Sequence, residues 1–136
     1  HHGISRAGHS LRVAKNTYKI TKKLNLNYEK ATRAALMHDF YTSNDLESKN
    51  SFEALSEHPS KALENARKYY NITSLEANII ESHMFPMGHK VPKYAESWIV
   101  SLVDKGVAFY EMYRYKISLT LGIYIIFMFN MITIQR

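Results

Sequence analysis

The 136-residue chain contains no cysteine. This absence excludes a disulfide scaffold, a thiolate zinc site and a cysteine nucleophile, so any bound metal must use nitrogen and oxygen ligands. It also fits a reducing compartment, and we expect a cytoplasmic protein. The length allows one domain, at roughly 100 to 200 residues per domain, and excludes a two-domain enzyme. An initiator methionine is missing as well, and the opening His1-His2-Gly3 predicts a fragment, a processed chain or a tag remnant.

Alternating apolar and polar runs, which would indicate strands, are also scarce. Apolar residues recur instead at helical spacing almost throughout the chain, and this pattern predicts an all-α fold. We expect helices over residues 6–24, 28–39, about 59–70, about 74–84 and 94–115.

Local signals predict where several of these helices begin. Asn27 is a good N-cap residue, and the 73–76 segment, Thr-x-x-Glu, is a capping box for the fourth helix. Pro59 suits the first turn of the third helix, which would place His58 at or beside its N-cap. Residues 41–57 are rich in Ser, Asn, Asp and Lys and predict an unusually long loop.

The same spacing predicts which helix faces turn inward. On the first helix the inner residues would be His9, Val13, Thr17, Ile20 and Leu24. On the fifth they would be Val100, Asp104, Val107 and Ala108.

Residues 117–134 form an 18-residue run without a charged side chain. A helix of that length spans about 27 Å, close to the roughly 30 Å hydrocarbon core of a bilayer. We therefore divide the chain into 1–116 and an apolar C-terminal segment, 117–136. That segment either associates with a membrane or packs on the helical bundle. Arg114 and Lys116 precede the run and favour the cytoplasmic side, so 1–116 would be anchored at the cytoplasmic face.

Five segments supply side chains that can bind a metal ion from an apolar helix face or a helix end. These side chains are His9, His38, Asp39, His58, His83 and Asp104. A single histidine on such a face is more often an ordinary core residue. Asp104 differs, because a carboxylate beside Leu102 and Val103 is costly to bury without a cation or strong donors. Metal ligation would satisfy it.

Several short motifs contain these residues in order. They are His9-Ser10-Leu11-Arg12-Val13-Ala14, Ala34-Ala35-Leu36-Met37-His38-Asp39, His58-Pro59, Ile79-Ile80-Glu81-Ser82-His83 and Ser101-Leu102-Val103-Asp104-Lys105. In order and in register they resemble segments of the HD-domain superfamily of metal-dependent phosphohydrolases, over about residues 1–112. The resemblance implies an HD-type bundle of about five or six helices, followed here by an apolar C-terminal helix or tail.

The resemblance also implies a ligand set. His9, His38, Asp39 and Asp104 would hold a first divalent transition metal. His58 and His83 fall where members with two metals have their extra ligands, and Asp39 would bridge the ions. Asp39 and His38 would be the catalytic residues. Imidazole and carboxylate ligands suit Fe, Mn, Zn or Ni.

The implied activity is hydrolysis of a phosphomonoester or phosphodiester, nucleotide-like in character, by a water that one or two such ions activate. The alternative is a non-catalytic HD fold that binds a phosphorylated ligand as a sensor. Lys105, Arg12 and Lys93 are candidates for contact with the substrate phosphate. The formal charge of +6 suits a small phosphorylated molecule, and the lysines are too scattered for specific nucleic-acid binding.

Overall fold

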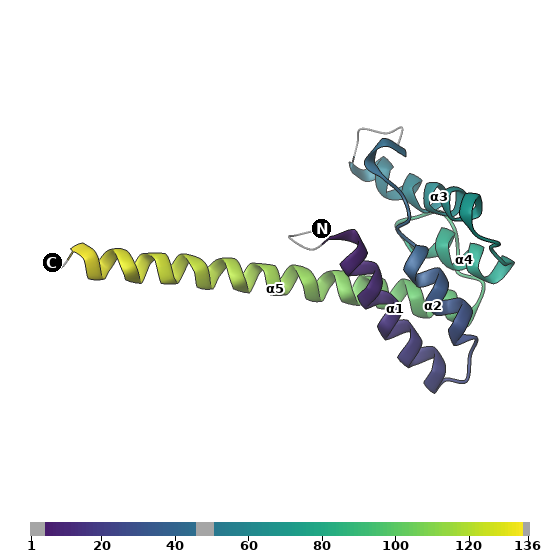
Figure 1. The fold of residues 1–136 in the computed structure, drawn as a ribbon, viewed down its shortest axis with the longest axis horizontal. Helices are drawn as coiled ribbons and strands as arrows, with labels where there is room; N and C mark the ends of the chain where they lie inside the picture. The colour runs from purple at the N-terminus through teal and green to yellow at the C-terminus, as the bar shows by residue number, and fades with distance from the viewer. Residues whose placement is uncertain (1–4, 46–50, 135–136) are drawn as a thin grey trace.

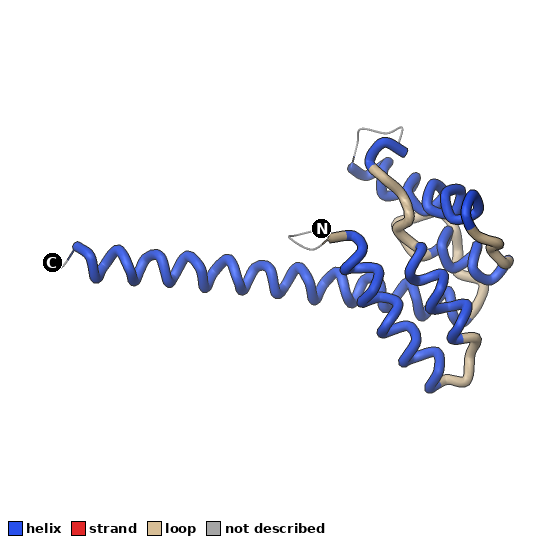
Figure 2. Tube along the Cα trace, viewed as in Figure 1, coloured by secondary structure: helices blue, strands red, loops and turns tan. Residues whose placement is uncertain are grey.

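The computed structural model describes residues 5–45 and 51–134, which fold into helices joined by short connections (Figures 1 and 2). The helices are α1 (Arg6–Lys23), α2 (Tyr28–Met37), the 3₁₀ helix η1 (Ser43–Asp45), α3 (Ser51–Tyr69), α4 (Ser74–Ser82) and α5 (Ala95–Ile134). These described ranges contain no strand. The predicted all-α helical bundle is therefore confirmed.

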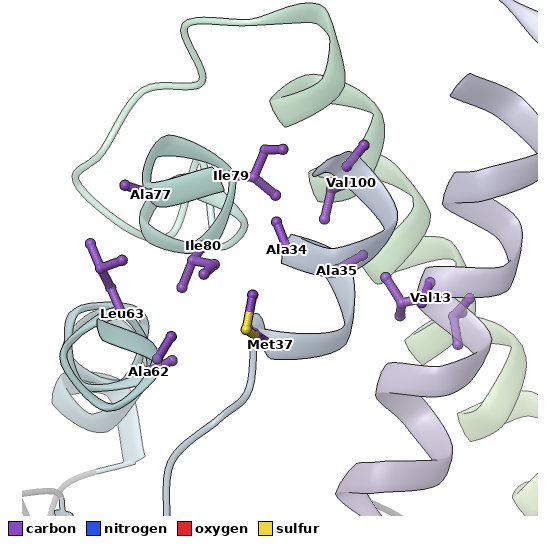
Figure 3. Packing of buried hydrophobic residues seen from close by; sticks show 14 residues of the cluster. Val13, Ala34, Ala35, Met37, Ala62, Leu63, Ala77, Ile79, Ile80 and Val100 are labelled. Atoms are coloured by element: carbon purple, nitrogen blue, oxygen red, sulfur yellow. The ribbon is translucent and has the colours of Figure 1, made fainter. Parts of the chain in front are cut away.

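The short helix α2 lies at the centre of the bundle. It packs against α1, α4 and α5, and its residues Ala31, Ala34 and Ala35 have no exposed surface. Figure 3 shows Val13 of α1 close to Ala35, and Ile79 of α4 close to Ala34. Small alanine side chains let the neighbouring helices approach α2 closely. As a result, the C-terminal end of α2 lies deep inside the molecule.

Two predicted helix starts are confirmed. The Asn27 side chain accepts a hydrogen bond from the backbone N–H of Lys30 and caps α2. Thr73 and Glu76 form the reciprocal capping box at the start of α4. Each cap satisfies backbone donors that the first helical turn leaves without partners.

The predicted start of the third helix is wrong. α3 already begins at Ser51, so Pro59 lies inside it and His58 is a buried residue of the helix interior. A proline inside a helix removes one N–H bond and its ring crowds the carbonyl four residues earlier, at a cost of about 3 kcal/mol, yet it does not force a helix start. The local preference of Pro59 for a first turn was therefore overridden. The predicted long loop is correspondingly shorter. η1 interrupts it, α3 takes up its end, and residues 46–50 lie outside the described ranges.

The predicted inner face of α1 is right at its beginning and wrong at its end. His9, Val13 and Thr17 are buried, but Ile20 is 40% exposed and Leu24 is 57% exposed. Thr21 is buried instead. The contact line follows steps of four residues throughout, through His9, Val13, Thr17 and Thr21, and α1 crosses α5 obliquely (Figure 1).

Helix α5 is a single element that continues well past the predicted end at residue 115. It runs for 40 residues, to Ile134. The segment contains no proline, so the backbone has nothing to interrupt the helix. Val100, Asp104 and Val107 are buried as predicted, whereas Ala108 is exposed and Glu111 is buried.

The C-terminal half of α5 extends away from the bundle (Figure 1). Its exposed apolar side chains include Ile117, Leu119, Leu121, Ile123, Tyr124, Ile125, Ile126 and Phe129. Within the part of the chain that the structure describes, no helix is both long enough and apolar enough to cross a membrane.

Candidate metal centre

Two helix ends direct histidines into the centre in the same way. His38 is the C-cap of α2 and His83 is the C-cap of α4, with nearly identical backbone angles. In each residue Nδ1–H donates to the carbonyl three residues earlier, Ala35 or Ile80, at 2.7 Å. These bonds fix the tautomer, so each Nε2 presents a lone pair to the centre.

A first donor group lies where α1, α2 and α5 meet. His9 Nε2 is 2.9 Å and His38 Nε2 is 3.4 Å from the same oxygen, Asp104 Oδ1. Asp39 Oδ2 lies 3.7 Å from His38 Nε2. Four of the six sequence-predicted ligands, His9, His38, Asp39 and Asp104, therefore come together here.

The remaining two predicted ligands form a second group on the other side of Asp39. Asp39 Oδ1 is 3.5 Å from His58 Nε2 and 3.8 Å from His83 Nε2. The two imidazole nitrogens are 3.0 Å apart. Asp39 thus turns one carboxylate oxygen to each group, which is the arrangement of a bridging ligand.

The distances between these nitrogen and oxygen atoms are close to those expected for atoms that bind the same cation. Two ligand atoms at about 2.1 Å from one ion are about 3.0 Å apart at a right angle and about 3.4 Å apart at the tetrahedral angle. The contacts above span 2.9 to 3.8 Å. His38 Nε2 is also buried and has no hydrogen-bond partner among the described residues. A buried lone pair of this kind is costly unless a cation or a donor satisfies it, and imidazole with carboxylate suits Fe, Mn, Zn or Ni.

The carboxylates set the charge of the first group. Burial lowers the pKa of His9, but its hydrogen bonds to Asp104 and Glu111 outweigh burial and raise that pKa to about 9. For His38, Asp104 and Asp39 likewise outweigh burial and raise the pKa. Burial raises the pKa of Asp104, and the imidazoles of His38 and His9 beside it more than reverse this and lower it. A metal ion entering the first group therefore replaces a proton on His9.

The second group differs, because burial and the neighbouring His38 lower the pKa of His83 to about 3. His83 is therefore a neutral imidazole across the physiological range and needs no proton removed before it can bind a cation.

Glu111 is a functional residue that the sequence reasoning missed. Its carboxylate lies 2.9 Å from His9 Nδ1 and accepts a hydrogen bond from Arg12 at 2.7 Å. One signal pointed to it, because Glu111 follows Asp104 by seven residues and so lies on the same face of α5, two turns away.

A cleft of about 610 Å³ lies next to the centre and includes Asp39 in its wall. Its other lining residues are Arg6, Phe40, Tyr41, Thr42, Asp45, Asn65, Lys68 and Tyr69. The Arg6 guanidinium lies over the Tyr41 ring, 4.4 Å from the ring centroid, and donates to the Tyr41 carbonyl. The Tyr41 ring in turn lies beside His58. The cleft thus combines positive charge and aromatic surface directly beside the candidate metal ligands.

The three predicted substrate contacts lie elsewhere. The Lys105 ammonium donates to the His83 carbonyl at 2.8 Å and to Ser101, and burial lowers its pKa. Arg12 pairs with Glu111. Lys93 is exposed, and its backbone N–H donates to Asn78. The residues lining the cleft include none of the three, and Arg6 and Lys68 supply its cations.

Comparisons with known proteins agree with this geometry. The model of a protein family described as HD domain matches residues 6–108, a range that contains all six candidate ligands. Searches of curated proteins and of solved structures found no match.

Proposed function

The chain belongs to the HD domain family, and on that premise we propose that it hydrolyses a phosphate ester with one or two divalent transition-metal ions. HD domains are commonly metal-dependent phosphohydrolases. The observation that carries the proposal is the meeting of imidazole and carboxylate groups from five segments. His9, His38 and Asp104 form one group, His38, Asp39 and His83 form another, and His58 Nε2 lies 3.5 Å from Asp39 Oδ1.

Each donor group has its own candidate ligands. His9, His38, Asp39 and Asp104 would hold one cation, and Asp39, His58 and His83 would hold the other. Bound there, a divalent cation supplies positive charge for phosphoryl oxygens and lowers the pKa of a water molecule toward neutrality. Asp39 has a special place, because one of its carboxylate oxygens faces His38 and the other faces His58 and His83.

The cleft beside Asp39 suits a small phosphorylated substrate. Arg6 and Lys68 present positive charges that can pair with the non-bridging phosphoryl oxygens. Phe40 and Tyr69 lie edge to face, with ring centroids 6.1 Å apart, and both are exposed. Their surfaces can pack against a planar ring in the leaving group, which supports a nucleotide-like ester.

We also propose that the exposed end of α5 associates with the cytoplasmic face of a membrane. Four consecutive residues, Ile123 to Ile126, are each more than 60% exposed, so apolar surface surrounds the helix. A helical partner would need an apolar stripe on one side only. Arg114 and Lys116 precede this surface and suit anionic headgroups.

The hydrolase proposal is tested by metal analysis and turnover on the same preparation. Protein purified without chelator should contain close to one or two equivalents of transition metal, and should hydrolyse members of a panel of nitrophenyl phosphates and nucleotides with Mn²⁺ added. Asp39→Asn should lose both properties, since the amide keeps the shape and removes the charge that faces both donor groups. Glu29→Gln, exposed in the first turn of α2, is the matched control and should keep both.

Folded, unsubstituted protein that holds no metal would contradict the proposal. Metal binding without turnover above that of Asp39→Asn would contradict the enzymatic part. That second result would favour a non-catalytic HD fold that senses a phosphorylated ligand.

A further inference from the structure

The buried carboxylate of Glu111 contacts the metal centre without belonging to either donor group. One oxygen, Oε2, accepts from His9 Nδ1 at 2.9 Å. The other, Oε1, accepts from Arg12 at 2.7 Å. Glu111 is only 6% exposed, so these bonds form largely out of water, where charge-assisted hydrogen bonds are strong.

Asp104 and Glu111 hold His9 from opposite sides of its ring. Asp104 lies 2.9 Å from Nε2 and Glu111 lies 2.9 Å from Nδ1. Both carboxylates come from the same face of α5, two turns apart. One helix therefore supplies both a candidate metal ligand and the acceptor that orients a second ligand.

We propose that Glu111 is a positioning residue of the metal centre, which keeps the His9 proton on Nδ1 and directs the Nε2 lone pair at the cation in the first donor group. This inference rests on the proposed metal site. An acceptor on the outer nitrogen of a ligating histidine fixes the ring and makes the ligating nitrogen more basic, and its loss typically lowers metal affinity about 10- to 100-fold.

A purely structural role for Glu111 leads to different expectations. In that case Glu111 would matter only as the partner of Arg12, joining α1 to α5. Removing either partner would then have the same effect. In the positioning role the two substitutions differ, because Glu111 itself is bonded to His9, whereas Arg12 is about half exposed and pairs with the other oxygen of Glu111.

The experiment is a calorimetric titration of the full chain with Mn²⁺ at constant pH. Glu111→Gln should weaken Mn²⁺ binding to the first donor group at least tenfold. Arg12→Gln should keep the affinity within about threefold of the unsubstituted protein, since it leaves the Glu111 carboxylate on His9. Glu76→Gln is the matched control, because Glu76 is a fully buried glutamate paired with Arg33 and remote from the centre. It should bind Mn²⁺ normally.

A second measurement reports on the ring itself. In Zn²⁺-loaded protein, nitrogen NMR of the labelled His9 imidazole should show the proton on Nδ1, and Glu111→Gln should reduce that preference. If Glu111→Gln does not fold, Glu111→Asp takes its place, because it keeps the charge and withdraws the carboxylate by one methylene.

Mn²⁺ affinity in folded Glu111→Gln equal to that of the unsubstituted protein would overturn the positioning role, as would equal losses in Glu111→Gln and Arg12→Gln. Absence of Mn²⁺ binding in the unsubstituted protein would instead overturn the metal site on which this inference rests.

Discussion

Single atoms set the geometry that each part of the candidate metal centre offers to a cation. Asp104 Oδ1 has two imidazole nitrogens within 3.4 Å, and each Asp39 oxygen faces a different set of histidines. The His38 and His83 nitrogens that point inward are fixed by backbone carbonyls on the opposite side of their rings. Such preorganised donors lose little freedom when a cation binds, so the ligands need not rearrange.

Arg6 is the cation whose position beside Asp39 most clearly suits a phosphate. Arg6→Gln should lower kcat/KM for a nitrophenyl phosphate roughly 10- to 100-fold, because a hydrogen bond to a charged group contributes about 1.5–3 kcal/mol. Metal content should stay unchanged, since the Arg6 guanidinium lies over the Tyr41 ring and donates to the Tyr41 carbonyl. Arg67→Gln, exposed in the last turn of α3, is the control. Equal kinetics for Arg6→Gln and the unsubstituted protein would remove Arg6 from the substrate cleft.

The helices serve the centre mainly through their ends. α2 and α4 each end at a histidine, and a bidentate pair joins the middle of α2 to the first turn of α4. Arg33 of α2 donates to both oxygens of Glu76 in α4, at 2.6 and 3.0 Å. Glu76 also accepts from Thr73, so it has no exposed surface and no unsatisfied oxygen. This link fixes α2 against the first turn of α4.

The Arg33–Glu76 link predicts a pH effect on stability. Burial raises the pKa of Glu76, but the hydrogen bonds from Arg33 and Thr73 outweigh it and lower the pKa below its usual value. A carboxyl whose pKa is lowered in the folded state stabilises the fold above its unfolded pKa, and this stabilisation is lost as the pH falls below about 4.5. Glu76→Gln should therefore reduce the free energy of unfolding by about 1–3 kcal/mol at pH 7.

The difference between the two proteins should shrink below pH 4.5, where Glu76 itself becomes protonated. Urea unfolding of metal-free protein between pH 3 and 7 measures this difference. A constant gap across that range would show that Glu76 contributes through packing and not through its charge. Glu64→Gln, exposed on α3, should show no comparable gap.

The molecule as a whole combines a small bundle with one helix that extends far beyond it (Figure 1). α5 carries Asp104 and Glu111 in its bundle half and the exposed apolar side chains in its outer half. Because the helix is continuous, Asp104 and Glu111 of the candidate metal centre are on the same helix as the apolar surface. A membrane at the outer half would hold the bundle near its surface.

Membrane association predicts that the full chain sediments with vesicles containing phosphatidylserine. Ile125→Asp should weaken this binding at least tenfold, since a charged aspartate within an apolar helix costs about 3 kcal/mol in hydrocarbon. Leu11→Asp, at an isolated exposed apolar residue of α1, is the matched control and should sediment normally. Self-association of the chain in analytical ultracentrifugation, without vesicle binding, would point to a second copy as the occupant of this surface.

The sequence by itself determined the helical class and the caps at Asn27 and Thr73, and its resemblance to the HD-domain superfamily predicted the six candidate ligands. Local physics explains the helices and caps, because helical spacing and capping oxygens are properties of short segments. Prediction from the sequence failed where the deciding interaction joins residues that are far apart in the chain. Pro59 favours the first turn of a helix and Ile20 favours a buried position, but in the folded protein Pro59 lies inside α3 and Ile20 is exposed. The sequence near the predicted end of α5 contains no local signal that would stop the helix.

Only the tertiary structure decided how the candidate ligands divide and what lies beside them. The division follows from which oxygen of Asp39 faces which helix, and that orientation depends on the packing of α2 between α1 and α4. The contact of Glu111 with His9 joins residues 102 positions apart in the chain. The cleft containing Arg6 and Lys68 likewise joins α1 to α3. Such contacts depend on how whole helices cross, and the spacing of residues within one helix carries no information about that angle.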